Sequence, residues 1–448
     1  MRQTLHIIGL IIACIAIVAS MMLIQCIQCT GLDNATESGK YTLQRSYRFY
    51  LGEEKIQTIT TITFTKTAPE QYDESWYANI AQTDDIMGYR CGTEVYIVGQ
   101  HIYANADSSY MFARFNSYGG EIWESLQRVN GLEAIDMQFC TNMRGIFAEQ
   151  TWTTIDGIAE WNTSNVTDMV GAFACCTNIT TLDIGDWNTS KVQDFSGMFS
   201  GHSWASDMKI TELPIDKWDT SSAIDMSHMF YGCAQLVEAP VTYWNVSNVK
   251  SFSHFFADCE KLEQPNIHNW DTSSVENFDA FFNDCRALTT LDVSGLDTGN
   301  CKQFSQMFEA CTNLKEITGL ETWDVSNANE SAFQQMFHAC TSLEYVDLSA
   351  WNAQPDDTAR MFANCSSLKY ANLSGIDMSQ CEWIQEMFWN CIALETVVWN
   401  VPYNLQSIMG YDSMMKGCNK NVCHVYTNRL CATPTPHVQT HHALSFFS

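Results

Sequence analysis

The sequence predicts an α/β fold, in which a repeat of about 26 residues builds a solenoid with one short parallel strand and one short helix per repeat. Three observations support this prediction. The repeat spacing is nearly constant, the residue types follow a fixed order within each repeat, and a stretch rich in strand-forming residues precedes the first repeat. A solenoid also explains the length of 448 residues, which is large for one ordinary domain.

The spacing is clearest at a recurring phrase in which a Met or Phe precedes a Phe and a Cys follows three residues later. Its second aromatic position falls at Phe147, Phe173, Phe199, Phe230, Phe256, Phe282, Phe308, Phe337, Phe362 and Phe388. Successive markers lie 25 to 31 residues apart and most lie 26 apart, and Met415 continues the series. A period this steady indicates a repeat architecture, because a single repeat could not bury its apolar face alone.

Each repeat divides into three parts. The first runs from the Cys through C-x-x-L into segments such as LTTLDVSGL (288–296), whose β-forming residues predict a short strand. The second is a W-[DN]-[TV]-S phrase, whose Asp, Asn, Ser and Thr residues are typical of turns and helix caps. In the third part, apolar residues such as Val275, Phe278 and Phe282 recur in steps of three and four, which predicts a two-turn helix.

The residues at the Phe, Cys and Trp positions are the predicted core of the solenoid. They are Phe173, Cys176, Phe230, Cys233, Phe256, Cys259, Phe282, Cys285, Phe308, Cys311, Phe337, Cys340, Phe362, Cys365, Phe388, Cys391, Trp161, Trp187, Trp218, Trp244, Trp270, Trp323 and Trp351. We favour a column of buried thiols over disulfides between neighbouring repeats, because pairing would divide identical repeats into partners and nothing in the sequence alternates. For the Trp column we favour an apolar plug over platforms for sugar stacking, because Leu296 and Ile376 occur at the same position.

Two sets of polar residues could bind metal ions. Asp or Asn follows the Trp position in most repeats, but one oxygen per repeat is few for calcium, which takes about six to eight oxygen ligands. We therefore expect these residues to cap local turns. Near the C-terminus, Cys418, Cys423, His424 and Cys431 lack the paired C-x2-C spacing typical of zinc sites, and a disulfide is the better expectation in an exported protein. We expect no metal and no cofactor.

Five segments follow from these patterns. Residues 1–30 form a targeting segment, 31–46 a tether, 47–125 a β-rich N-terminal cap, 126–420 the solenoid of about ten to eleven repeats, and 421–448 a C-terminal cap and tail. The uncharged run Ile7 to Ile24 is typical of a signal peptide or an uncleaved membrane anchor. A lipoprotein signal with lipidation at Cys26 is a third possibility, although Gln25 stands where a small residue is expected. Each of these three interpretations predicts that the rest of the chain is exported.

The repeat resembles the BspA-like leucine-rich-repeat surface proteins, in the variant with the phrase WDTSxVxxM and MFxxCxxL. The resemblance covers about residues 130–420, and the stretch GTEVYIVGQHIYANADSSYMF (92–112) is similar to the leader that precedes such repeats. It implies a leucine-rich-repeat solenoid, secretion or surface anchoring, and a role in adhesion. His202 and Gln150 depart from the pattern, since each stands where Cys is expected.

Composition narrows the classes of function. The 51 acidic and 23 basic residues give a net charge of −28, which disfavours nucleic acid and anionic membranes as partners. The sequence contains no nucleophile elbow, zinc-protease motif or phosphate-binding loop. We therefore expect a non-enzymatic surface protein that binds an extracellular protein or glycan and contacts the membrane only through its N-terminal segment. The alternatives are a structural spacer of the cell envelope and a carbohydrate-active protein.

Overall fold

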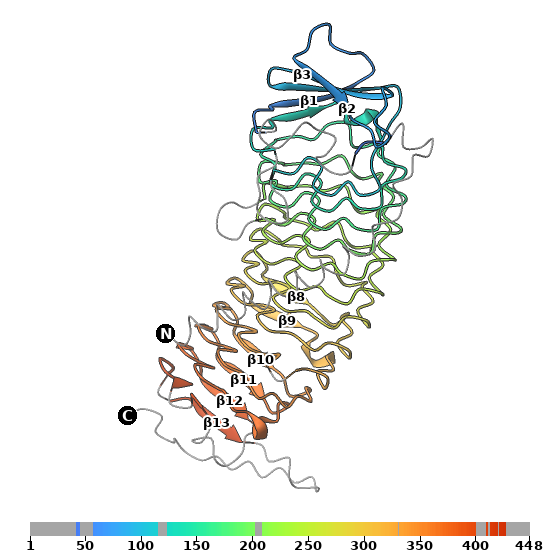
Figure 1. Cartoon of the computed structure of the whole chain (residues 1–448). Helices are drawn as coiled ribbons and strands as arrows, with labels where there is room; N and C mark the ends of the chain where they lie inside the picture. The colour runs from blue at the N-terminus through green and yellow to red at the C-terminus, as the bar shows by residue number, and fades with distance from the viewer. Residues whose placement is uncertain are drawn as a thin grey trace.

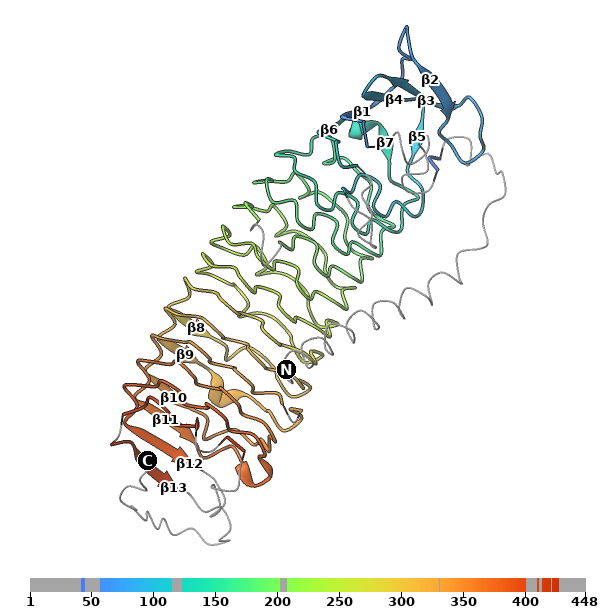
Figure 2. The same ribbon diagram turned by 60° about the vertical axis from the view of Figure 1, so that its left-hand side comes forward.

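The computed structural model describes residues 42–44, 57–114, 123–201, 208–329, 331–399, 409–410, 413–419 and 421–426. The repeats stack one on another into a long, gently curved solenoid (Figure 1). A sheet of N-terminal strands lies at one end of the stack, and a second sheet lies at the C-terminal end, as a turned view also shows (Figure 2). Each turn of the solenoid is called a rung below, and the predicted solenoid is present.

The secondary structure of the described residues consists of short strands and 3-10 helices. The strands are β1 (Thr61–Thr65), β2 (Glu74–Tyr77), β3 (Ile86–Cys91), β4 (Glu94–Gly99), β5 (Ile102–Tyr103), β6 (Arg128–Asn130), β7 (Ile135–Asp136), β8 (Thr290–Asp292), β9 (Glu316–Thr318), β10 (Tyr345–Asp347), β11 (Tyr370–Leu373), β12 (Thr396–Trp399) and β13 (Cys423–Tyr426). The 3-10 helices are η3 (Leu132–Ala134), η4 (Leu320–Thr322) and η5 (Met378–Gln380).

The N-terminal sheet has five strands in the order β2-β3-β4-β1-β6. Strand β1 is parallel to both β4 and β6, whereas β3 is antiparallel to β2 and β4. Its alternating residues Ile62, Phe64, Val95 and Ile97 are buried, as the period of two in a half-buried strand requires. That this sheet acts as a cap for the solenoid stays a prediction.

Parallel strand pairing joins rungs along the side of the solenoid that holds β8 to β13, which is called the strand side below. In the C-terminal rungs β8 pairs with β9, and a separate sheet pairs β10, β11, β12 and β13 in that order. The register advances by one rung at a time, with Tyr345 opposite Tyr370 and Tyr370 opposite Thr396. In an earlier pair of rungs the same side holds only a single bridge, between Glu238 and Gln264. One strand per repeat is therefore seen only in the C-terminal rungs.

A second parallel ladder follows another side of the solenoid and consists of single bridges. It runs from rung to rung through Asp107, Asn142, Asp168, Asp194, Asp225, Ser251, Asn277 and Gln303. This ladder links rungs between which the strand side is paired only in places, and it fixes their register.

The predicted helix in each repeat is wrong, because the described residues contain no α-helix. The segment from Met169 to Cys176 shows what takes its place. The amides of Met169, Gly171 and Phe173 donate to carbonyls of the following rung at 2.9–3.0 Å. The alternate amides, such as that of Ala172 to the carbonyl of Met169 (3.1 Å), close tight local turns. Half of the amides thus bond between rungs, which an α-helix does not allow.

Left-handed backbone conformations enforce these turns. The residue two positions before the marker Phe has a positive φ in each repeat, as in Gly171 (58°), His228 (59°) and Ala280 (51°). A residue in this region ends a right-handed helix. The apolar spacing nevertheless predicted the correct face, since Val275, Phe278 and Phe282 are all fully buried.

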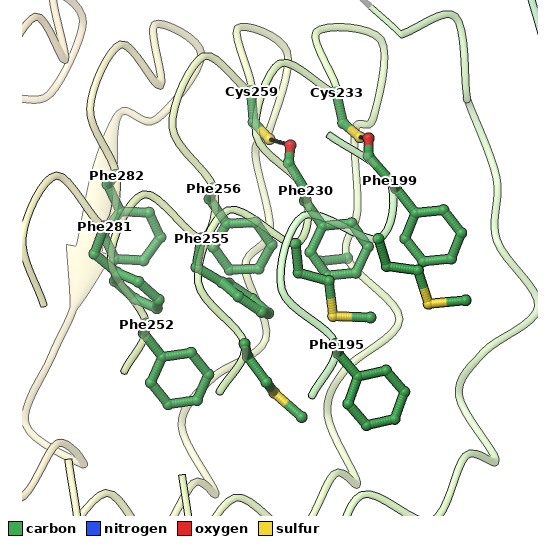
Figure 3. Close-up of a cluster of buried hydrophobic side chains, with 14 of the residues drawn as sticks. Phe195, Phe199, Phe230, Cys233, Phe252, Phe255, Phe256, Cys259, Phe281 and Phe282 are labelled. Atoms are coloured by element: carbon green, nitrogen blue, oxygen red, sulfur yellow. Dashed lines mark hydrogen bonds between the residues drawn. The ribbon is translucent and has the colours of Figure 1, made fainter. Parts of the chain in front are cut away.

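The centre of the solenoid is a continuous stack of aromatic rings. The ring of Phe112 and the marker Phe rings from Phe147 to Phe388 follow one another with centroids 5.2 to 6.2 Å apart. Between Phe195 and Phe282 further Phe rings fill the space beside this column (Figure 3). Offset ring stacking adds stability beyond the burial of area, so each rung depends on both of its neighbours.

Candidate binding surface

The Cys column is a ladder of buried free thiols. Each thiol donates to the carbonyl of the marker Phe in the preceding rung, as Cys259 does to Phe230 (Figure 3). The distances lie between 2.9 and 3.4 Å for Cys176, Cys233, Cys259, Cys285, Cys311, Cys340, Cys365, Cys391 and Cys418. The cysteines of this ladder form no disulfide in the described part of the chain. The thiols therefore satisfy buried carbonyls, and the ladder leaves none of them accessible for chemistry.

Burial also makes most thiols of this ladder hard to ionise. It raises the pKa of Cys176, Cys311 and Cys365 to about 12. The pKa of Cys259 and Cys285 lies well above the ordinary value of 9.0 for the same reason. Since the thiolate is the reactive form, these residues are poor nucleophiles and poor metal ligands.

The Trp column lies inside the solenoid. Trp161, Trp187, Trp218, Trp244, Trp270, Trp323 and Trp351 are each at most 4% exposed. Each indole nitrogen donates to a carbonyl of the preceding rung at 2.8 to 3.2 Å, as in Trp270 to Val241. Rings this deeply buried cannot stack on a sugar, so the Trp residues join rungs and fill the corner of the core.

The Asp or Asn after the Trp position closes a local turn. Its carboxylate or amide oxygen accepts from the backbone amide two residues later, at 3.0 Å in Asp219 and 3.1 Å in Asp271. The next residue, often Thr, donates its hydroxyl to the following rung, as Thr272 does to the carbonyl of Asp297 (2.9 Å). These oxygens serve turns, which agrees with capping rather than with a calcium site. Among the described residues, no group of three His, Cys, Asp or Glu could hold a metal ion.

Part of the sequence-based prediction falls outside the described residues. The targeting segment, the tether apart from residues 42–44, Cys26, Cys431 and the side chains of Cys423 and His424 belong to this part. Within the predicted tether, Thr42 and Leu43 are buried and form bridges to Tyr103 and Asn79, so the prediction of a tether is wrong for these residues. Within the described ranges, no helix is both long enough and apolar enough to span a membrane.

A network of polar side chains links neighbouring rungs and contains a carboxyl group and an imidazole with shifted pKa values. Glu309 accepts from Asn283 (3.2 Å) and His338 (2.8 Å), which come from the neighbouring rungs. Burial and the nearby Glu309 raise the pKa of Asp279 to about 6, and burial lowers that of His254 to about 4. The bonds between these side chains link adjacent rungs, so the network has a structural explanation without a substrate.

Exposed apolar side chains occur in the C-terminal rungs. Tyr345 is 56% exposed, Ile392 59% and Met409 54%, while Trp383 and Trp389 are each 37% exposed. We call these five residues the C-terminal apolar group. The ring of Tyr345 stacks on that of Tyr370 with centroids 4.9 Å apart, so it is held in place although it faces solvent. Sequence reasoning missed this group because these residues occupy variable positions of the repeat.

Comparison with solved structures finds other repeat proteins. Solved structures similar to this chain include three leucine-rich-repeat proteins. One from Bacteroides ovatus is 14% identical with a TM-score of 0.30, and the match covers 82% of this chain and 92% of that one. A leucine rich cell surface protein from Faecalibacterium prausnitzii (13%, TM-score 0.25) matches over 89% and 92%, and a protein from Eubacterium ventriosum (12%, TM-score 0.33) over 77% and 95%. Likenesses this low carry no functional argument, and no curated protein matches the chain.

The model of one protein family matches the repeats themselves. The matches cover residues 107–213, 202–319 and 305–425, which together span well over half of the 448 residues. They coincide with the stacked rungs described above. The chain belongs to the family described as Mycoplasma protein of unknown function, DUF285.

Proposed function

We propose that this chain is an exported cell-surface protein whose solenoid binds an extracellular partner and thereby serves adhesion, as in the BspA-like proteins that its repeat resembles. The observation that carries this proposal is the C-terminal apolar group, since aromatic and Met side chains are enriched in protein interfaces. Ile392 and Met409 are aliphatic and well exposed, which favours a protein partner over a glycan.

The rest of the chain supports the same proposal. The uncharged run Ile7 to Ile24 would direct export and could tether the protein to the membrane. Solenoids present long surfaces that bind extended partners, provided that their ends are covered. The N-terminal five-stranded sheet would cover one end of the stack in this arrangement.

Binding of the full chain to immobilised collagen, laminin, fibronectin, mucin and a glycan panel tests the proposal. The informative variant carries Tyr345→Ser, Trp389→Ser and Ile392→Ser. We expect saturable binding to at least one protein and a loss of at least tenfold in affinity in this variant, because aromatic side chains dominate interface energetics.

The matched control carries Tyr72→Ser, Tyr77→Ser and Ile80→Ser, which replaces three exposed apolar residues near the other end of the chain (51%, 50% and 37% exposed). It should bind like the unmodified protein. If the folded chain binds nothing on the panel, or if both triple variants lose affinity equally, the proposal is wrong. The first outcome would favour a spacer of the cell envelope.

A further inference from the structure

The ladder on the strand side is interrupted between residues 263–268 and strand β8. In several other rungs, the amide of the residue after the recurring Leu donates to the rung before, as Glu263 does to Val237, Lys315 to Thr289 and Lys369 to Glu344, each at 2.9 Å, although the equivalent amides of Val237 and Glu344 have no such bond. The equivalent amide of Thr289 has no such bond to Glu263. Both segments are described throughout, and no hydrogen bond joins residues 263–268 to 289–292. The strand edge of β8 is therefore open here.

Two residues distort the backbone at this interruption. Pro265 occupies a ladder position and has no amide hydrogen to donate. Asn266 adopts a positive φ of 55°, which turns the backbone out of an extended path. Its side-chain amide donates to the carboxylate of Glu238 (3.1 Å) and the carbonyl of Ala239 (3.2 Å), which holds it toward the preceding rung. Specific contacts thus hold the backbone at Pro265 and Asn266 in this irregular conformation.

The interruption leaves a pocket of about 460 Å³ between the two rungs. Its apolar lining comes from Ile267 and Leu291, which are only 3% and 5% exposed. Its polar lining includes Glu263, Asp292 and His268, and none of its lining residues is Lys or Arg. The volume lies within the range of about 300–1,000 Å³ that is usual for ligand sites.

The pocket is negative at neutral pH. Glu263 is exposed and forms no ion pair within the described residues. The backbone amide and hydroxyl of Ser294 lower the pKa of Asp292, so its carboxylate stays ionised. The uncharged polar residues Gln264, Thr289 and Thr290 lie in the same lining and add further hydrogen-bond acceptors.

We propose that this pocket binds the arginine side chain of a basic partner protein. A guanidinium carries a fixed positive charge and five donors in one plane, which suits a lining of carboxylates and uncharged polar residues. Its weak hydration and flat faces also suit the apolar floor formed by Ile267 and Leu291. The net charge of −28 would draw a basic partner toward the solenoid.

This assignment deepens the proposed function, because it names the chemistry of a partner, but it uses none of the C-terminal apolar group. A failure of the arginine pocket can therefore be distinguished from a failure of binding through the C-terminal apolar group.

The test titrates the full chain with a fluorescent Gly-Gly-Arg-Gly-Gly peptide and with the same peptide carrying citrulline. Citrulline keeps the shape of arginine and removes its charge. We expect saturable binding of the arginine peptide and at least tenfold weaker binding of the citrulline peptide.

Two variants locate the site. Glu263→Gln with Asp292→Asn removes both carboxylates and should weaken binding at least tenfold. Pro265→Leu places the residue type found at the equivalent Leu291, restores a backbone donor and should close the pocket, with the same loss of binding. The matched control, Glu321→Gln with Asp324→Asn, removes two exposed carboxylates from outside the pocket lining, and Asp324 caps a turn as Asp292 does.

The control should bind the arginine peptide within twofold of the unmodified chain. Absence of arginine-peptide binding to the folded chain would overturn the assignment, as would equal affinity for the citrulline peptide. Unchanged affinity in the Glu263→Gln, Asp292→Asn variant would place any binding elsewhere and would overturn it as well.

Discussion

Raising the pH above 9 should unfold this protein steeply, because its thiol ladder cannot ionise inside the solenoid. In the unfolded chain the thiols titrate near pH 9, whereas burial raises the pKa of Cys176, Cys311 and Cys365 to about 12 in the folded state. A raised pKa in the folded state means that the stability is fully present below pH 9 and is lost as the pH rises toward the folded value. Each such thiol then costs up to about 1.4 kcal/mol per pH unit.

Several thiols act together, so the summed loss by pH 10 to 11 should approach the total stability of a typical domain, about 5–15 kcal/mol. The free energy of unfolding measured in urea between pH 7.5 and 10.5 tests this. A variant with Cys285→Ala, Cys311→Ala and Cys340→Ala should be less stable at pH 7.5 and should show a shallower decline above pH 9. The same slope in both proteins would show that other groups cause the alkaline loss.

Replacing Trp270 by Ala should lower the free energy of unfolding by about 3–5 kcal/mol, the usual cost of removing a large buried aromatic side chain. The indole is 3% exposed, and its ring lies 4.8 Å from that of Phe252. Its nitrogen also satisfies the carbonyl of Val241 at 3.0 Å, which the substitution would leave without this donor. Urea unfolding followed by circular dichroism measures the change.

Two further variants separate the contributions. Trp270→Phe keeps most of the ring packing and removes the hydrogen bond, so it should cost about 1–3 kcal/mol. Trp389→Ala removes a Trp that is 37% exposed, and its effect should stay within about 1 kcal/mol. If Trp270→Ala were no more harmful than Trp389→Ala, the Trp column would not join the rungs as described.

The repeat spacing predicted the solenoid and its buried columns because side-chain periodicity reports which residues face the core. It did not report the backbone conformation. The pattern of Val275, Phe278 and Phe282 fits a helix, and a series of tight turns buries the same three residues. Gly145, Gly171 and Gly197, each two residues before the marker Phe, were a usable signal, since glycine readily adopts a positive φ. Residues such as His228 and Arg360 hide this signal in the later repeats.

The candidate surfaces were harder to predict because they lie at positions that vary between repeats. Exposure of Tyr345 or Ile392 depends on how the rungs stack, and no periodicity reports it. The interruption at Pro265 had a signal in the sequence, since proline seldom occurs within a paired strand. Its consequence, an open β8 edge beside Glu263 and Asp292, required the structure.

Deleting one whole rung tests most directly the claim that each repeated phrase is one interchangeable turn of a solenoid. Removing residues 248–273 takes out 26 residues and joins Ser247 to Ser274, so that the phrase reads WNVSSVENF. The shortened chain should unfold cooperatively, with only the stability of one rung and its interfaces lost. Removing residues 248–260 takes out half a rung, shifts every later core residue out of register and should abolish the cooperative transition. Equal loss of the transition in both deletions would contradict the account.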